Sequence, residues 1–194
     1  MSIYLNKDVL QEASKVRKII FEHRKKFYQK YNIDILVNDT LTSTLIYDIV
    51  SCYDKTYNVN FARNGEDAIS GDVIIEQKCS RVESEYTKKG KLRKNAGNDA
   101  AFVFHAHGDL CYPRYIFAAI DKESMNIKRL YDISKKTNVK NIQKYLLNQR
   151  KIWDKKCQLN AKHKKMDAIR LPEKEIKKFK LKKMIVNNSV VFKD

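Results

Sequence analysis

The sequence has no pair of cysteines spaced for a zinc knuckle or a thioredoxin-type redox site. Its four cysteines, Cys52, Cys79, Cys111 and Cys157, lie far apart along the chain. Both kinds of site need closely spaced pairs such as C-x-x-C, so both are disfavoured. We therefore expect buried free thiols in a reducing compartment.

Long apolar runs and linker tracts are also missing. No stretch approaches the roughly 18 consecutive apolar residues of a transmembrane helix, which excludes one. The N-terminus lacks the basic-then-apolar layout of a secretion signal, which predicts an intracellular, cytoplasmic protein. There is no internal repeat and no tract rich in Pro, Gly and Ser, so we expect the 194 residues to form one domain.

Acidic residues are few relative to basic ones. The chain has 40 Lys and Arg against 23 Asp and Glu, a net charge of +17. An excess of this size indicates a polyanionic partner, either nucleic acid or an acidic membrane surface. No stretch combines a wide apolar helical face with a lysine-rich one, so nucleic acid is favoured over a membrane.

The basic excess is concentrated near the C-terminus. Residues 151–194 hold 14 Lys and Arg against 5 Asp and Glu. We expect this segment to follow phosphates, with Lys164 and Lys165 among the contacts. The alternative is a solvated lysine face that only aids solubility.

The apolar pattern predicts a mixed sheet flanked by helices, in a single α/β or α+β domain. Apolar residues recur at helical spacing from residue 7 to about 31, and a second helix is expected to begin at the N-cap residue Asp39. Further along, the pattern predicts strands at 73–78, 101–107 and 115–120 and a terminal hairpin of 184–186 with 190–192. Between them it predicts a helical stretch with one apolar stripe of Val139, Ile142, Tyr145, Leu146 and Trp153. We expect residues 1–55 to be helical and to dimerise, 56–135 to form the catalytic sheet, and 136–194 to contact DNA.

The hairpin that leads into residues 76–78 carries the strongest chemical signal. Residues 70–72 are turn chemistry, and the apolar, β-branched run 73–75 predicts a buried central strand. Glu76 and Lys78 are two residues apart on that strand, so both side chains leave the same face. Asp67 can lie across from them on the partner strand.

Two carboxylates and an ammonium at one sheet edge suit a hard divalent cation and a water that must lose its proton. The hairpin therefore predicts metal-dependent hydrolysis of phosphodiester bonds. The spacing alone is weak, and the alternative is an exposed Glu76–Lys78 pair that contributes almost nothing. The apolar strand before Glu76 and the +17 charge favour catalysis. Asp72 is a further acidic residue of the hairpin, but it is better explained as part of the turn than as a catalytic acid.

Residues 63–68 and 75–80 resemble the PD-(D/E)XK nuclease motif. Asp67 matches the first acid and Glu76-Gln77-Lys78 matches the E-x-K, while Glu66 replaces the proline usual before the first acid. Within that superfamily, the chain from about residue 30 to 130 is similar to type II restriction endonucleases of the EcoRV-like branch.

The resemblance implies a restriction-endonuclease-like core and a homodimer that cuts double-stranded DNA at a short palindromic site. It implies one or two Mg²⁺ ions held by Asp67, Glu76 and the backbone carbonyl of Gln77, with Glu66 as a reserve ligand. Lys78 would orient or deprotonate the attacking water, and cleavage would leave 5′-phosphates. The N-terminal helices are the expected dimer surface, with Asp39 at the dimer or DNA surface.

Two further readings stay open: a structure-specific, repair or phage nuclease with the same core, and a basic DNA-binding protein without catalysis. Base reading needs Arg, Lys, Asn or His side chains on a loop or ribbon that fits the major groove. One predicted set follows the active strand and comprises Arg81, Lys88, Lys91, Arg93, Lys94 and Asn95. The other comprises His105, His107 and Arg114. The two histidines alternate on an expected strand and so would share a sheet face; a metal role for them lacks a third ligand.

Overall fold

The computed structural model describes residues 53–59, 67–82, 100–121, 127–159 and 167–179, the backbone of 183–186 and 189–192, and single positions between 12 and 51. Among the helices of these residues, none is long and apolar enough to cross a membrane.

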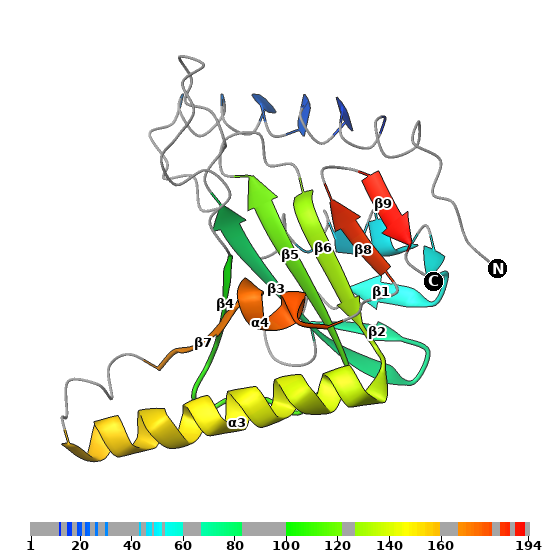
Figure 1. Ribbon diagram of the computed structural model, residues 1–194. Coiled ribbons are helices and arrows are strands. Elements are labelled where there is room, and N and C mark those ends of the chain that lie inside the picture. The colour runs from blue at the N-terminus through cyan, green and yellow to red at the C-terminus, as the bar shows by residue number, and fades with distance from the viewer. Residues whose placement is uncertain are drawn as a thin grey trace.

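A seven-stranded mixed sheet is the centre of the fold (Figure 1). Its strands are β1 (Tyr57–Val59), β2 (Ala68–Ser70), β3 (Val73–Val82), β5 (Arg114–Asp121), β6 (Ile127–Ile133), β8 (Lys183–Val186) and β9 (Ser189–Phe192), which neighbour one another in this order. The β3–β5 pair is parallel and the other pairs are antiparallel. The predicted mixed sheet with flanking helices is therefore confirmed, as is the terminal hairpin.

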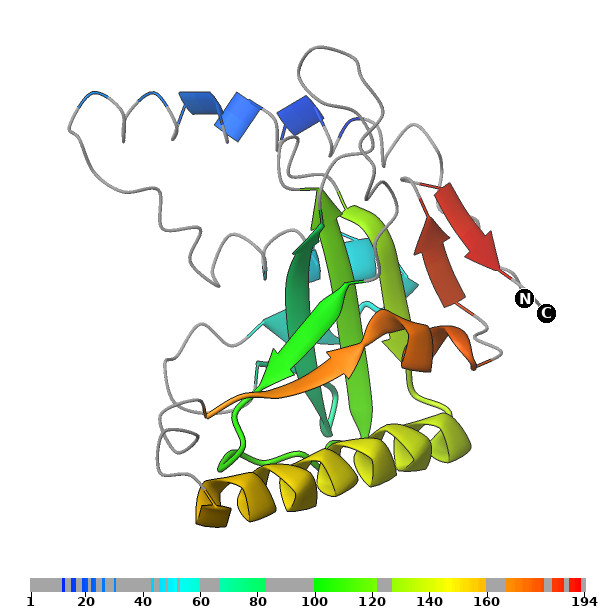
Figure 2. The same cartoon turned by 60° about the vertical axis from the view of Figure 1, so that its left-hand side comes forward.

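A second layer covers one face of this sheet. It consists of a two-stranded antiparallel sheet, β4 (Ala101–Phe104) with β7 (Ile169–Pro172), and the helices α3 (Lys136–Leu159) and α4 (Glu173–Lys177). Figure 2 shows β4 and β7 crossing in front of the central strands, while α3 lies across their ends. The other face is covered by a helical segment whose Ile46, Ile49 and Val50 are buried.

The pattern of buried residues explains why β5 is central. All eight of its residues are buried, as expected for a strand with helices or strands packed on both faces. Tyr115 and Phe117 face the core beneath α3, whereas Ile116 and Ala118 face the opposite core. The sheet therefore separates two hydrophobic cores.

A buried carboxylate joins the second layer to the main sheet. Glu173, at the start of α4, is fully buried and accepts hydrogen bonds from the backbone N–H of Ala100 at 2.7 Å and from Nη2 of Arg129 at 2.8 Å. The Nε of Arg129 and the hydroxyl of Tyr131 also donate to it. Burial opposes the charge, but these donors outweigh it and hold the pKa of Glu173 below its usual range.

The predicted strand 101–107 ends at Phe104. The last pair of its ladder with β7 is Phe104 with Ile169. Beyond that pair, the side chain of Asp167 accepts hydrogen bonds from the backbone N–H groups of Ala106 (2.6 Å) and His107 (3.2 Å). The Asp167 carboxylate therefore replaces a backbone acceptor of β7, and the chain leaves the β4–β7 sheet after Phe104.

The apolar run before Glu76 is not continuously buried, contrary to the sequence-based expectation. Ile75 is fully buried, but Val73 is 40% exposed and Ile74 is 37% exposed. The reason is the length of the neighbouring strand: β5 begins at Arg114, opposite Ile75. The tip of the β2–β3 hairpin therefore projects beyond β5.

The expectation of buried thiols holds only in part. Cys79, Cys111 and Cys157 are free; Cys157 is buried, Cys79 is half-buried and Cys111 is exposed. Cys52 lies outside the described residues.

Candidate active site

Asp67, Glu76 and Lys78 come together near the middle of β3, just after the point where β5 begins to pair with it. The Nζ atom of Lys78 lies 2.6 Å from Oε1 of Glu76 and 3.2 Å from Oδ2 of Asp67. One ammonium is thus shared by two carboxylates. The strand period and the hairpin pairing predicted this arrangement, and the structure has it.

The hairpin register explains why Asp67 reaches Glu76 and Lys78. The β2 ladder begins with the pair Ala68–Ile75, so the residue before Ala68 lies opposite the residue after Ile75. No β2 residue remains to pair with Gln77, and Oδ2 of Asp67 accepts its backbone N–H at 3.1 Å instead.

The same geometry places the Gln77 carbonyl. The N–H and C=O groups of one strand residue point toward the same edge, so this oxygen faces the side occupied by Asp67. The Gln77 side chain leaves the opposite face, where its Oε1 accepts a hydrogen bond from Tyr57 at 2.5 Å.

Burial disfavours the charged form of the carboxylate pair. Glu76 is 6% exposed. Its burial and the nearby Asp67 charge raise the pKa of Glu76 to about 7, although Lys78 opposes the shift. Burial also opposes the charge of Lys78, but the two carboxylates outweigh it and raise the pKa of that ammonium. When both carboxylates are ionised, the three side chains carry a net charge of −1, which a bound cation would neutralise.

The donor set fits a hard divalent cation. Asp67, Glu76 and the Gln77 carbonyl supply three oxygens at one edge, and Mg²⁺ is commonly held by one or two carboxylates together with water and phosphate oxygens. Within the described part of the chain, no group of three His, Cys, Asp or Glu side chains could hold a metal. A cation held by Asp67, Glu76 and the Gln77 carbonyl would need water or phosphate oxygens to complete its shell.

Two aromatic residues complete the surroundings. The ring of Phe104 lies under the Lys78 ammonium, 5.7 Å from Nζ to the ring centre. Burial and the charges of Glu76, Asp109 and Asp67 raise the pKa of Tyr112, which lies near the carboxylate pair. No short-range pattern could have found Tyr112, because it comes near Glu76 only through the pairing of Glu76 with Tyr115 across β3 and β5.

The loop that carries Tyr112 is anchored on α3. Gln143 donates to the carbonyl of Tyr112 at 3.0 Å, and Arg150 donates to the carbonyl of Gly108. The hydroxyl of Tyr115 accepts the Tyr112 N–H at 3.1 Å and donates to the Leu110 carbonyl at 2.6 Å. These bonds fix the wall of the site that faces Glu76.

Arg114, predicted to contact DNA, has a structural role instead. Its guanidinium is buried and bonds Asp132 in bidentate fashion, at 2.9 Å and 2.7 Å, and Asp54 at 2.5 Å. Asp54 also accepts hydrogen bonds from Ser70. Arg114 therefore fixes the hairpin to the main sheet from the face opposite the carboxylate pair.

His105 and His107 do not share a strand face. Both lie past the end of β4; His105 is exposed near Asp167, with 3.6 Å between Nδ1 and Oδ2, and His107 packs edge-on against Trp153 at 4.8 Å between ring centres. Arg81 is exposed near the end of β3. The other predicted contacts lie outside the described residues: Asp39, Glu66, Lys88, Lys91, Arg93, Lys94, Asn95, Lys164 and Lys165.

The helix α3 lies within the region expected to contact DNA, but the gathering of its basic residues on one stripe was not predicted. The helix carries seven Lys and Arg and one acidic residue, Asp154. Its lysines are all exposed: Lys136, Lys140, Lys144, Lys151, Lys155 and Lys156. Their spacing at four and seven residues puts most of them on one stripe, which is a signal the sequence does contain.

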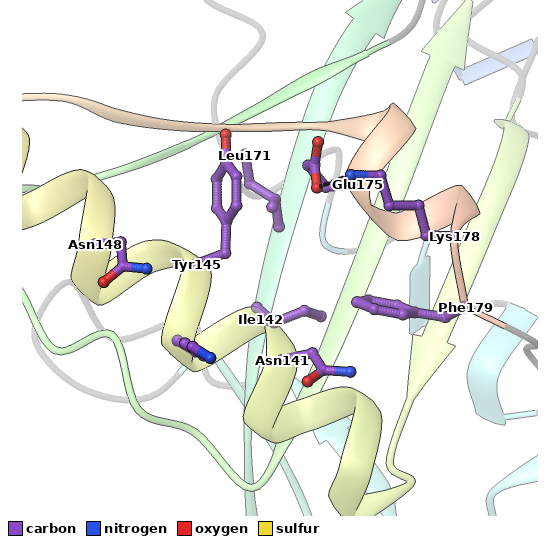
Figure 3. A pocket seen from close by; sticks show the side chains of 9 residues that line it. Asn141, Ile142, Tyr145, Asn148, Leu171, Glu175, Lys178 and Phe179 are labelled. Atoms are coloured by element: carbon purple, nitrogen blue, oxygen red, sulfur yellow. Dashed lines mark hydrogen bonds and ion pairs between the residues drawn. The ribbon is translucent and has the colours of Figure 1, made fainter.

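A pocket of about 230 Å³ lies between α3 and the β7–α4 segment (Figure 3). Ile142, Leu171 and Phe179 form its apolar part, while Tyr145 and the Glu175–Lys178 ion pair border it. None of the three predicted catalytic residues lines it, so the pocket is separate from the candidate site.

The candidate site is thus defined by its own geometry: two carboxylates, one ammonium and one backbone carbonyl at one edge of β3. No protein-family model matches the chain, and no curated protein matches it either.

Proposed function

We propose that the protein is a Mg²⁺-dependent endonuclease that hydrolyses phosphodiester bonds in double-stranded DNA, of the type II restriction class. The observation that carries the proposal is the Lys78 ammonium held between Asp67 and Glu76 near the middle of β3. The mixed sheet, with its parallel β3–β5 pair beside these residues, is compatible with a restriction-endonuclease-like core.

The residues have distinct roles in this proposal. Asp67, Glu76 and the Gln77 carbonyl would hold Mg²⁺, which supplies Lewis-acid stabilisation of the phosphate charge. Lys78 has a raised pKa and is an ammonium at neutral pH, so orienting the water and stabilising phosphate charge suit it better than removing a proton.

The reaction needs no covalent enzyme intermediate. The water oxygen attacks phosphorus in line, the P–O3′ bond breaks, and a proton from the water ends on the departing 3′ oxygen. The products are a 5′-phosphate and a 3′-hydroxyl.

Charge and symmetry support the choice of substrate. The net charge of +17 and the exposed lysines of α3 suit a phosphate backbone. The described part of one chain holds one such cluster and a duplex has two strands to cut, so we propose that the protein acts as a homodimer.

Digestion of a sequenced plasmid in the presence of Mg²⁺, followed by sequencing of the ends, tests the class of nuclease. We expect discrete fragments whose ends share one short palindromic sequence and carry 5′-phosphates. A smear, or cutting confined to branched DNA, would instead identify a non-specific or structure-specific nuclease. DNA binding without any cutting would identify a non-catalytic DNA-binding protein.

A further inference from the structure

Two exposed isoleucines lie beside the catalytic carboxylates. Ile69 and Ile74 are direct cross-strand partners in the β2–β3 hairpin, and they are 41% and 37% exposed. Residues two apart on a strand share a face. Ile69 is therefore on the face of Asp67, and Ile74 is on the face of Glu76 and Lys78.

The buried neighbours confirm this orientation. Ala68 and Ile75 are paired with each other, are fully buried, and belong to the core on the opposite face. Same-face residues on a strand are about 7 Å apart, so the isoleucine pair continues the row formed by Lys78 and Glu76. We name Ile69 and Ile74 the isoleucine ledge.

We infer that the isoleucine ledge contacts the sugar next to the scissile phosphate and selects deoxyribose over ribose. The inference rests on the proposed nuclease function. Successive nucleotides of one strand are about 3.4 Å apart along the duplex axis. A phosphate held at Asp67, Glu76 and Lys78 therefore brings one of the two sugars next to it over the ledge.

The chemistry of the ledge decides which sugar it accepts. The 2′-hydroxyl is the group by which a protein distinguishes RNA from DNA, and it both donates and accepts hydrogen bonds. Ile69 and Ile74 offer only methyl and methylene groups. A hydroxyl pressed against them loses its water without gaining a partner, whereas the C2′ methylene of deoxyribose loses nothing.

A nucleotide fits this patch better than a second copy of the chain. The ledge is two side chains wide, whereas a stable protein interface buries about 800 Å² on each partner. The ledge is also continuous with the carboxylate row that the proposed function assigns to the scissile phosphate.

Three duplexes carrying the mapped cleavage site test the inference. One is all-deoxy, and the other two have a single ribonucleotide on the 5′ or the 3′ side of the scissile phosphate. We expect the wild-type protein to cut one ribo-substituted duplex about 10- to 100-fold more slowly than the all-deoxy duplex, the range in which an apolar surface rejects an added hydroxyl. In Ile69→Thr/Ile74→Thr that ratio should fall below about threefold, because threonine supplies a hydroxyl partner.

Two control variants separate the ledge from general effects. Ile69→Val/Ile74→Val keeps an apolar ledge and should keep the wild-type ratio. Val73 is on the same hairpin and is 40% exposed, but its side chain projects from the opposite face of the sheet. Val73→Thr should therefore also keep the wild-type ratio of the two cleavage rates. Thermal melting of each variant verifies that it is folded.

The outcomes distinguish the inference from the function beneath it. If the wild type cuts the all-deoxy and ribo-substituted duplexes at equal rates, the role of the ledge is wrong but the nuclease function is supported. The same holds if the threonine variant keeps the wild-type ratio. Loss of a dimer in the threonine variant with an unchanged ratio also overturns the role of the ledge, in favour of a protein contact. No cleavage of any DNA by the wild-type protein overturns both.

Discussion

Glu76→Gln is expected to abolish cleavage and at the same time to stabilise the folded protein in the absence of divalent metal. Replacing the carboxylate removes a metal ligand, so we expect cleavage to fall by at least about 100-fold. The same change removes a buried charge whose pKa is raised to about 7. Denaturant unfolding in EDTA at pH 8 should show the variant more stable by about 1–3 kcal/mol.

The pH dependence of this effect has a defined sign. The folded protein binds a proton at Glu76 up to about pH 7, whereas an unfolded carboxyl loses it near its ordinary pKa of 4.5. Rising pH between these values therefore lowers the free energy of unfolding of the wild-type protein. This contribution is absent from the variant, so the stability difference should be small at pH 4.5 and largest above pH 7.

Added Mg²⁺ should reverse the order of stability. A cation bound to Asp67 and Glu76 stabilises only the folded wild type, so its melting temperature should rise with Mg²⁺ while that of Glu76→Gln stays nearly constant. Glu175→Gln is the matched control, since Glu175 is a half-buried carboxylate of α4 that pairs with Lys178 outside the candidate site. Destabilisation by Glu76→Gln in EDTA would contradict the electrostatics assigned to the site.

Glu173→Gln is expected to lower the free energy of unfolding by about 3–5 kcal/mol, because it leaves Arg129 without its buried partner. Urea unfolding at pH 7 measures the loss. Glu175→Gln, two residues along the same helix, should cost less than about 1 kcal/mol, because its ion pair with Lys178 is largely at the surface.

The Glu173 effect should disappear at low pH, with a sign opposite to that of Glu76. The folded pKa of Glu173 is lowered, so its contribution is complete above the ordinary carboxyl pKa and is lost as the pH falls through the folded value. Arg129→Met combined with Glu173→Gln should recover part of the loss, because no unpaired charge remains buried. Equal costs for Glu173→Gln and Glu175→Gln would show that the buried network does not hold α4 to the sheet.

The local part of the site could be predicted from the sequence because the strand period fixes it. Glu76 and Lys78 share a face in any extended strand, and the turn at residues 70–72 determines that Asp67 lies opposite them. The helical stripe of α3 was likewise predictable from spacing, and its Val139, Ile142, Leu146 and Trp153 are buried.

The rest depended on contacts between segments far apart in the sequence. Arg114 follows a proline and has the character of a surface residue, yet its partner Asp54 is sixty positions away and both lie inside. His105 lies outside the strand because the backbone N–H groups of Ala106 and His107 donate to the side chain of Asp167 and not to a strand partner. Tyr112 comes near Glu76 only because β5 runs parallel beside β3. No local pattern encodes any of these three contacts.

Nicking and linearisation of supercoiled plasmid by wild type, Lys78→Ala and Lys128→Ala, each in Mg²⁺ and in EDTA, test the central claim most directly. Lys128 is the matched control. Its Nζ lies 3.3 Å from Oδ2 of Asp121, and this ion pair is outside the candidate site. We expect Mg²⁺-dependent cleavage by wild type and Lys128→Ala, and a loss of about 10²- to 10⁴-fold in Lys78→Ala with DNA binding retained. Cleavage in EDTA, or wild-type cleavage by Lys78→Ala, would contradict a metal-dependent nuclease site built on Asp67, Glu76 and Lys78.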